Sequence, residues 1–173
     1  MIRAWFEAAG LPVDVEILRK VGIFKGLILS WSKRINLLSG KDVGLIIKNH
    51  FLDSLGPINE IPHEGRFVDI GSGSGFPAIP LALLRPAAFF TLTESVHKKV
   101  LFLREAQREL SLENIEILEG RFENLALPRS FDMATVRALP RLKTLIPKIR
   151  EIVRPGGKII YYEKRGQYRL IPV

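Results

Sequence analysis

The segment VDIGSGSGFP at residues 68–77 restricts the fold more than any other part of the chain. An apolar run here ends in three glycines that alternate with serine, and this order predicts a strand, a tight turn and a helix. Pro77 suits the first turn of that helix, where a missing N–H does no harm. Without Cβ atoms, Gly71 and Gly73 can turn sharply and let the backbone approach a ligand. The segment therefore predicts a strand–turn–helix unit with a ligand at the turn.

From Arg66 onward, short apolar runs alternate with helical patterns, which indicates an α/β fold with a mostly parallel, doubly wound, Rossmann-like sheet. Strands are expected near residues 66–70, 89–93, 115–118, 131–136 and 158–162, with Pro155-Gly156-Gly157 as a turn before the last. Ligands of such sheets lie beyond the carboxyl ends of the strands. Site residues should therefore follow the first four strands.

The apolar pattern of residues 1–56 differs from that of the core (66–173) and predicts a helical extension. Apolar residues recur at spacings of four and three from Ile17 to Ile35, with Asp14 placed to cap the helix. A second helix is expected near residues 42–55, where His50 and Asp53 share one face. Those two residues could meet a substrate, but a local polar pair is the favoured interpretation. Residues 1–173 are expected to form one domain, since single cores commonly serve roughly 100 to 200 residues.

The glycine spacing distinguishes between two cofactors. A dinucleotide site of the form G-x-G-x-x-G requires glycine at position 76, where this chain has Phe76. The pattern instead fits the acidic-x-Gly-x-Gly-x-Gly signature of class I methyltransferases, with Asp69 as the acid and Gly75 as the third glycine. The carboxylate of S-adenosylmethionine suits a helix N-terminus, and its cationic groups suit a carboxylate such as Asp69. The sequence therefore favours S-adenosylmethionine.

A second carboxylate, Glu94, follows the second predicted strand, 23 residues after Gly71. An acid at this place is expected to bind ribose hydroxyls. The alternative is an acid that faces the dipole of the following helix. Given the neighbouring glycine turn, the ribose role is favoured.

The composition places limits on partners and location. The 26 Lys and Arg exceed the 18 Asp and Glu, giving a net charge of +8 that suits a polyanion such as RNA, although a generally basic surface explains it equally well. No apolar run approaches the roughly 20 residues of a membrane helix, so we expect a cytoplasmic protein. A monomer with no metal site is also expected. The absence of cysteine excludes any reaction that needs a thiolate.

Several further motifs resemble the RsmG (GidB) family of bacterial methyltransferases. They are WSKRINL at 31–37, HFLDSL at 50–55, VDIGSGSGFPAIPLA at 68–82, KKVLFLRE at 98–105, GRFENL at 120–125, VRAL at 136–139 and RPGG at 154–157. The resemblance covers most of the chain and implies methylation of guanine N7 in 16S ribosomal RNA, free or within the 30S subunit. The family more usually has Asn at Ser32 and Arg at Asn49. Only eleven residues follow Tyr162, fewer than the helix and two strands that complete a typical member, so a short C-terminus is expected.

The resemblance also implies roles for single residues. It implies that Gly71 and Phe76 line the cofactor site, that Phe122 and Glu123 border the adenine, and that Arg137 faces the donor or the substrate. Without the family, Phe122 would be a core residue and Glu123 a solvated carboxylate. For Arg137, three acceptors stay open: guanine O6, an RNA phosphate or the carboxylate of the donor.

The chemistry of methyl acceptors narrows the reaction independently. Methylation of pyrimidine C5 normally needs a cysteine nucleophile, which this chain lacks. Exocyclic amines commonly need Asp or Asn before Pro-Pro-aromatic, but the fourth strand is followed by VRALP. Guanine N7 carries a lone pair and no proton, so it needs no general base. Two alternatives remain: a methyltransferase of another RNA, a protein or a small molecule, and a non-catalytic basic RNA-binding domain.

Overall fold

The computed structural model describes residues 2–8, 10–11, 14–38, 45–138, 142–163 and 167–173. Its centre is a six-stranded sheet in the order β3-β2-β1-β4-β5-β6. The strands are β1 (Gly65–Ile70), β2 (Ala88–Glu94), β3 (Ile115–Glu119), β4 (Phe131–Arg137), β5 (Val153–Tyr162) and β6 (Tyr168–Pro172). The first five strands pair in parallel, and β6 pairs with β5 in the antiparallel sense.

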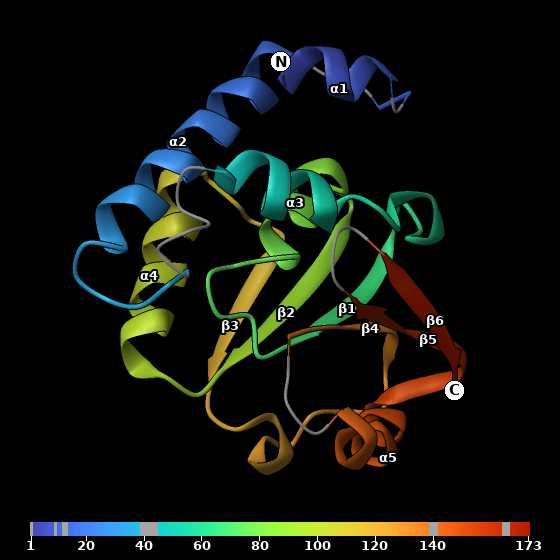
Figure 1. Cartoon of the computed structure of the whole chain (residues 1–173). Coiled ribbons are helices and arrows are strands. Elements are labelled where there is room, and N and C mark those ends of the chain that lie inside the picture. The colour runs from blue at the N-terminus through green and yellow to red at the C-terminus, as the bar shows by residue number, and fades with distance from the viewer. Residues whose placement is uncertain (1, 9, 12–13, 39–44, 139–141, 164–166) are drawn as a thin grey trace.

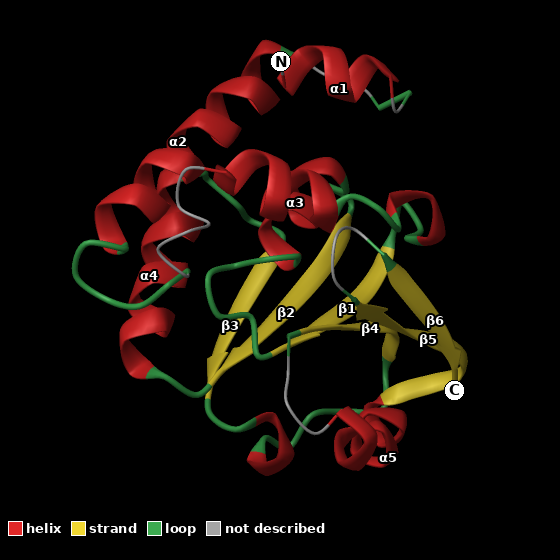
Figure 2. Ribbon diagram, in the orientation of Figure 1, coloured by secondary structure: helices red, strands yellow, loops and turns green. Residues whose placement is uncertain are grey.

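Helices cover both faces of the sheet (Figures 1 and 2). They are α1 (Ile2–Ala8), α2 (Val15–Trp31), α3 (Ala78–Leu84), α4 (His97–Glu109) and α5 (Leu142–Ile152). One core joins α2, α3 and α4 to one face of the sheet, and the other joins α5 to the opposite face. Neighbouring residues on β1 serve different cores, Phe67 the first and Val68 the second, because side chains alternate along a strand. The sheet is therefore doubly wound, as the sequence predicted.

The five predicted strands are confirmed, and their bounds differ mainly in the fifth. β5 begins at Val153, so residues 155–157 lie inside it and not in a turn before it. The pairing of β4 with β5 shifts its register between Phe131 and Met133. Gly156 has a φ of +79°, a conformation that allows the strand to continue through this irregularity. The Pro-Gly-Gly sequence predicts a turn at the same place.

Strand β6 was not predicted, and its residues were expected only as a short C-terminus. Alternation along this strand is weak, since none of its residues is fully buried. Backbone hydrogen bonds to β5 and contacts of Tyr168 and Leu170 with the core hold it in place. Helix α1 was not predicted either.

The N-terminal extension is helical, as predicted, but its first long helix ends earlier than the apolar pattern indicated. In α2, Val21, Phe24 and Ile28 are buried, and Asp14 caps the helix by accepting a 2.7 Å hydrogen bond from the Ile17 N–H. At its other end, Trp31 donates to Glu105 of α4 at 3.1 Å and packs edge-on against Phe102. Ile35 lies beyond the end of this helix.

The second predicted helix, residues 42–55, lies partly outside the described residues. Its described portion winds as a π-helix over Ile47–Leu52, followed by a final helical turn. Phe51 and Leu55 point into the core, as the stripe predicted. The wider π-turn could not be foreseen, because its apolar spacing also fits an ordinary helix. Across the described residues, no helix is both long enough and apolar enough to cross a membrane.

Candidate active site

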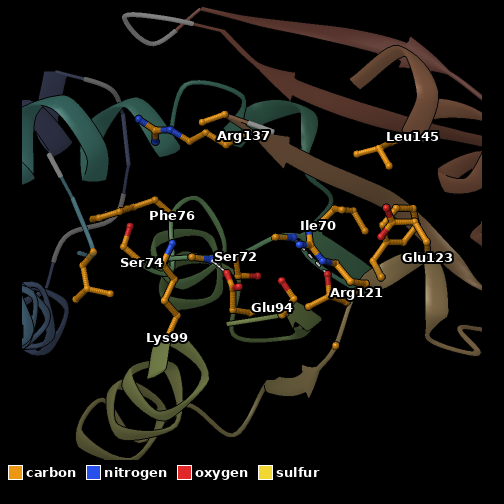
Figure 3. A pocket seen from close by; sticks show the side chains of 18 of the residues that line it. Ile70, Ser72, Ser74, Phe76, Glu94, Lys99, Arg121, Glu123, Arg137 and Leu145 are labelled. Atoms are coloured by element: carbon orange, nitrogen blue, oxygen red, sulfur yellow. Dashed lines mark hydrogen bonds between the residues drawn. The ribbon is translucent and has the colours of Figure 1, made fainter. Parts of the chain in front are cut away.

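A cavity of about 880 Å³ opens at the carboxyl ends of β1 to β4 (Figure 3). The N-terminal extension and the loops after these strands all contribute to its wall. The lining residues are Leu37, Leu38, His50, Ile70, Gly71, Ser72, Gly73, Ser74, Phe76, Thr93, Glu94, Ser95, Lys99, Gly120, Arg121, Phe122, Glu123, Arg137, Ala138, Thr144 and Leu145. The site thus lies where a parallel sheet is expected to bind its ligand.

The glycine turn forms part of this wall. Gly71, Gly73 and Gly75 all have left-handed backbones, with φ of 72°, 55° and 82°. A Cβ on Gly73 would contact only Gly71 O at 3.7 Å and Glu94 Oε2 at 4.0 Å, so the backbone is open toward a ligand. At Gly75, by contrast, a Cβ would lie 2.5 Å from Ile79 Cδ1. Gly75 is not among the lining residues, and its role in the structure is close packing of the turn on α3.

Glu94 connects β2 to both the glycine turn and α4. Its side chain is 6% exposed, Oε2 accepts from Gly73 N and Oε1 from Val96 N, each at 2.8 Å. Val96 is the N-cap of α4, so the carboxylate does bind the start of a helix. It also lines the cavity, so its remaining lone pairs can accept from a ligand. Both sequence interpretations of Glu94 are therefore compatible with one geometry.

Asp69 lies beneath the cavity and is not among its lining residues. The side chain is 1% exposed, and Oδ1 accepts a 2.6 Å hydrogen bond from Thr135 Oγ1. Burial raises the pKa of Asp69 to about 6, although hydrogen bonds from Thr135 and Ser72 and the charge of Arg137 oppose this rise. A carboxylate in this position acts on the cavity through its charge rather than by direct contact.

Arg137 lines the cavity, but its guanidinium is directed at the N-terminal extension. It donates to Asn49 O at 3.0 Å, His50 O at 3.3 Å and Ser54 Oγ at 3.2 Å. Asp53 pairs with it at 3.9 Å. Figure 3 shows this side chain extending away from Glu94 and Arg121. Arg137 thus connects the π-helix to the end of β4, a contact that was not predicted.

His50 joins this contact on the cavity side. Its ring stacks on Phe76 with centroids 5.3 Å apart and planes at 28°, and its Nδ1 lies 3.4 Å from Arg137 Nη2. The favoured sequence interpretation, a local polar pair or cap, did not include this arrangement. Both side chains meet residues of the core, His50 at Phe76 and Asp53 at Arg137. The HFLDSL motif was the only signal that could have indicated it.

Phe122 and Glu123 lie at the Leu145 end of the cavity, after β3. Phe122 is 7% exposed and packs in the core beneath α5, so the expectation of a core residue and the expectation of a lining residue are compatible. Glu123 is exposed and also lines the cavity. Lining residues outside the predicted set include Leu37, Leu38, Lys99, Arg121, Thr144 and Leu145. Leu37, Lys99 and Arg121 lie in motifs that carry the family resemblance, but no chemical role was predicted for them.

The backbone after Arg137 is unusual as well. Ala138 has a φ of +53°, a left-handed conformation that is unfavourable for a residue with a Cβ. Strained residues of this kind gather at functional sites. The turn ends β4 at the cavity wall.

Among the described residues, no cluster of three or more His, Asp or Glu could hold a metal ion.

The sheet order, the glycine turn after β1 and the acid after β2 together define a class I methyltransferase fold. Solved structures agree: a TYW2 from P. horikoshii in complex with MeSAdo matches with a TM-score of 0.59 and 18% identity, covering 65% of this chain and 42% of that one. A tRNA (m1A58) methyltransferase from Aquifex aeolicus matches with a TM-score of 0.55 and 20% identity, covering 63% and 44%.

Sequence comparison identifies the family. The model for rRNA small subunit methyltransferase G (GidB) matches residues 17–171, and the chain belongs to this family. The ribosomal RNA small subunit methyltransferase G of Shigella dysenteriae is 35% identical over 92% of the chain and 75% of that protein. That of Xanthomonas oryzae is 40% identical over 79% of the chain and 64% of that protein. This chain therefore covers about two thirds to three quarters of such relatives.

Proposed function

We propose that this protein transfers a methyl group from S-adenosylmethionine to N7 of a guanosine in 16S ribosomal RNA. The observation that carries the proposal is the joint placement of Gly73 and Glu94 on one cavity wall, in a chain of the rRNA small subunit methyltransferase G family. The net charge of +8 supports a polyanionic acceptor. Residues 1–173 would act as one domain, and the monomeric state and cytoplasmic location stay predictions.

The residues present fit such a donor. Gly71 and Gly73 line the cavity, and the open backbone at Gly73 allows close approach of its methionine part. The Glu94 carboxylate can accept from ribose hydroxyls. Phe122 offers an apolar wall and Glu123 a carboxylate for the adenine, with Phe76 at the opposite end. The carboxylate of Asp69, which is 1% exposed, would add negative charge that favours a sulfonium in the cavity.

The reaction requires little from the side chains. S-adenosylmethionine supplies a methyl carbon that N7 attacks with its lone pair, while the carbon–sulfur bond breaks and its electrons stay on sulfur. No proton moves, so no residue must act as a base. The task of the cavity is to align the reacting atoms and exclude water, an effect worth up to roughly 7–11 kcal/mol in well-oriented systems.

Arg137 has a defined part in this proposal. Because its N–H groups hold the π-helix, it positions the extension against the site and contributes positive charge at the edge of the cavity. It is thus a positioning residue, in place of the direct contact that was expected.

The decisive experiment supplies the protein with methyl-labelled donor and, in parallel, 30S subunits, naked 16S RNA or tRNA. Label should enter 16S RNA, and chain cleavage specific for 7-methylguanosine should release it at one guanosine. Label in tRNA alone, or none in any RNA while the donor binds, would overturn the proposal in favour of another methyltransferase or a binding domain.

A further inference from the structure

The cavity is larger than the donor-binding pattern accounts for. Its volume of about 880 Å³ lies near the upper end of the roughly 300–1,000 Å³ found for small-molecule sites. Gly71, Glu94 and Phe122 fit the donor, but they come only from the loops after β1, β2 and β3. The remaining wall contains Leu37, Leu38 and His50 from the N-terminal extension, next to Phe76.

This second part of the wall has the chemistry of a nucleobase site. Enzymes that react with a base in RNA commonly hold it outside the stack, between aromatic and apolar side chains. His50 is partly exposed and lies over Phe76, which is 6% exposed, so the imidazole is the accessible ring of the pair. Leu37 and Leu38 also line the cavity, and both belong to the hydrophobic core that contains Phe76.

The His50 ring also contacts the residue that holds the π-helix. Its Nδ1 lies 3.4 Å from Nη2 of Arg137. The imidazole presents an aromatic face suited to stacking on a base.

Lys99 contributes a positive charge to the cavity. Lys99 lines the cavity from the first turn of α4 and is half-buried. In Figure 3 its amine end points toward the glycine turn, close to Ser74 and Ser72. Within the part of the chain that the structure describes, no ion pair of Lys99 occurs. Its charge is thus available to an anion at the cavity, whereas Arg137 is held by the extension.

We infer that Leu37, Leu38 and His50 form the subsite for the acceptor nucleotide, with Phe76 supporting the His50 ring and Lys99 binding a phosphate of that nucleotide. The base lies against the His50 ring, and the N-terminal extension thereby completes the active site. This inference rests on the proposed function and assigns the part of the cavity that the donor does not use.

The ring of His50 is tested by two variants. Stacking on one aromatic side chain is worth about 1–3 kcal/mol per base, so His50→Ala should lower kcat/KM for 16S RNA or 30S subunits by roughly 10- to 100-fold. His50→Phe keeps an aromatic face and should retain activity within about fivefold. Donor affinity, measured by calorimetry, should change less than about twofold in both, which also shows that both fold.

The outcomes separate the inference from its alternatives. If His50 only holds Arg137, the Ala and Phe variants will lose activity equally. If His50 belongs to the donor site, donor affinity will fall together with turnover. Either result overturns the inference, whereas inactive wild-type protein that binds donor would refute the proposed function instead.

Lys99 is tested against its neighbour Lys98, which is exposed on the same turn and does not line the cavity. Lys99→Gln should raise the KM for RNA about tenfold and reduce the slope of log KM against log salt by about one, as for loss of one phosphate contact. Lys98→Gln should stay within about twofold of wild type. Equal effects of the two variants, or a loss of donor affinity in Lys99→Gln, would contradict the assignment of Lys99.

Discussion

The Glu94 end of the cavity is made by loops of the sheet, whereas the His50 end is made by a helix that reaches the sheet through Arg137. At the Glu94 end, one carboxylate bonds to Gly73 in the next loop, and the parallel strands β1 and β2 fix both residues. At the His50 end, the π-helix depends on Arg137, which lies 87 residues further along the chain. The residues at the Glu94 end are therefore positioned by the parallel sheet itself. Those at the His50 end are positioned by one long-range contact.

Because the two ends are built differently, substitutions at one end should weaken donor binding and substitutions at the other should weaken acceptor binding. The largest expected effect is at the Glu94 end. Glu94→Ala should weaken donor binding by about 1,000-fold, or about 4 kcal/mol, because it removes charge-assisted hydrogen bonds worth roughly 1.5–3 kcal/mol each. Calorimetric titration with the donor measures this loss.

Glu119→Ala is the matched control, since Glu119 pairs with Glu94 on the neighbouring strand but is exposed and does not line the cavity. Its donor affinity should stay within twofold of wild type. A Glu94→Ala variant that binds donor normally would remove the distinction between the two ends.

Arg137→Ala should have the next largest effect, at the other end. It leaves Asn49 O and His50 O without their partner and releases the π-helix, so kcat/KM for RNA should fall by roughly 100- to 1,000-fold, or about 3–4 kcal/mol. Donor affinity should change less than about threefold. Steady-state kinetics and calorimetry on the same sample provide both values.

Arg137→Lys should not restore activity, because one ammonium cannot reproduce the fork of donors that reaches three acceptors. If donor affinity falls as far as kcat/KM in Arg137→Ala, then Arg137 holds the donor and not the extension.

Asp69 allows a third test, based on stability. Its pKa of about 6 exceeds the unfolded value of 3.8, so the folded state holds the proton more tightly. This contribution to stability is fully present below pH 3.8 and is lost as pH rises to about 6, on the order of 3 kcal/mol. Asp69→Asn lacks that loss, so relative to wild type it should gain stability between pH 4 and pH 7.

Urea unfolding of both proteins at the two pH values measures the change, and the difference between them cancels the titration of all other groups. An equal pH dependence in the two proteins would show that the buried carboxyl has an ordinary pKa.

The two ends also differ in how well the sequence predicted them. The glycine turn, Glu94 and the first five strands could be predicted, because local turn chemistry and short apolar runs encode them. The stacking of His50 on Phe76 and the direction of Arg137 could not, since nothing local distinguishes an arginine that binds a ligand from one that binds backbone carbonyls. Gly75 and Asp69 were expected at the ligand, but both lie behind the cavity wall, since a spacing pattern does not show which side a residue faces.

The smallest predicted effect concerns the extension far from the cavity. Asp14→Ala removes the cap of α2 and should cost about 1 kcal/mol of unfolding free energy with little change in methyl transfer. Glu16→Ala, which removes ion pairs to Arg19 and Lys20 at the surface, should cost less than Asp14→Ala. Thermal or urea unfolding distinguishes the two. A large loss of RNA methylation in Asp14→Ala would mean that α2 contributes to the acceptor end more directly than its position indicates.

The junction of Trp31 with Glu105 and Phe102 also gives the molecule an intrinsic optical probe. The sequence contains two tryptophans, and replacing Trp5 by Phe would leave Trp31 as the single indole emitter. Its fluorescence arises where α2 meets α4, so separation of the two helices would expose the ring to water and shift the emission to longer wavelength. Stopped-flow mixing with RNA could then time the response of the N-terminal helices without any radioactive label.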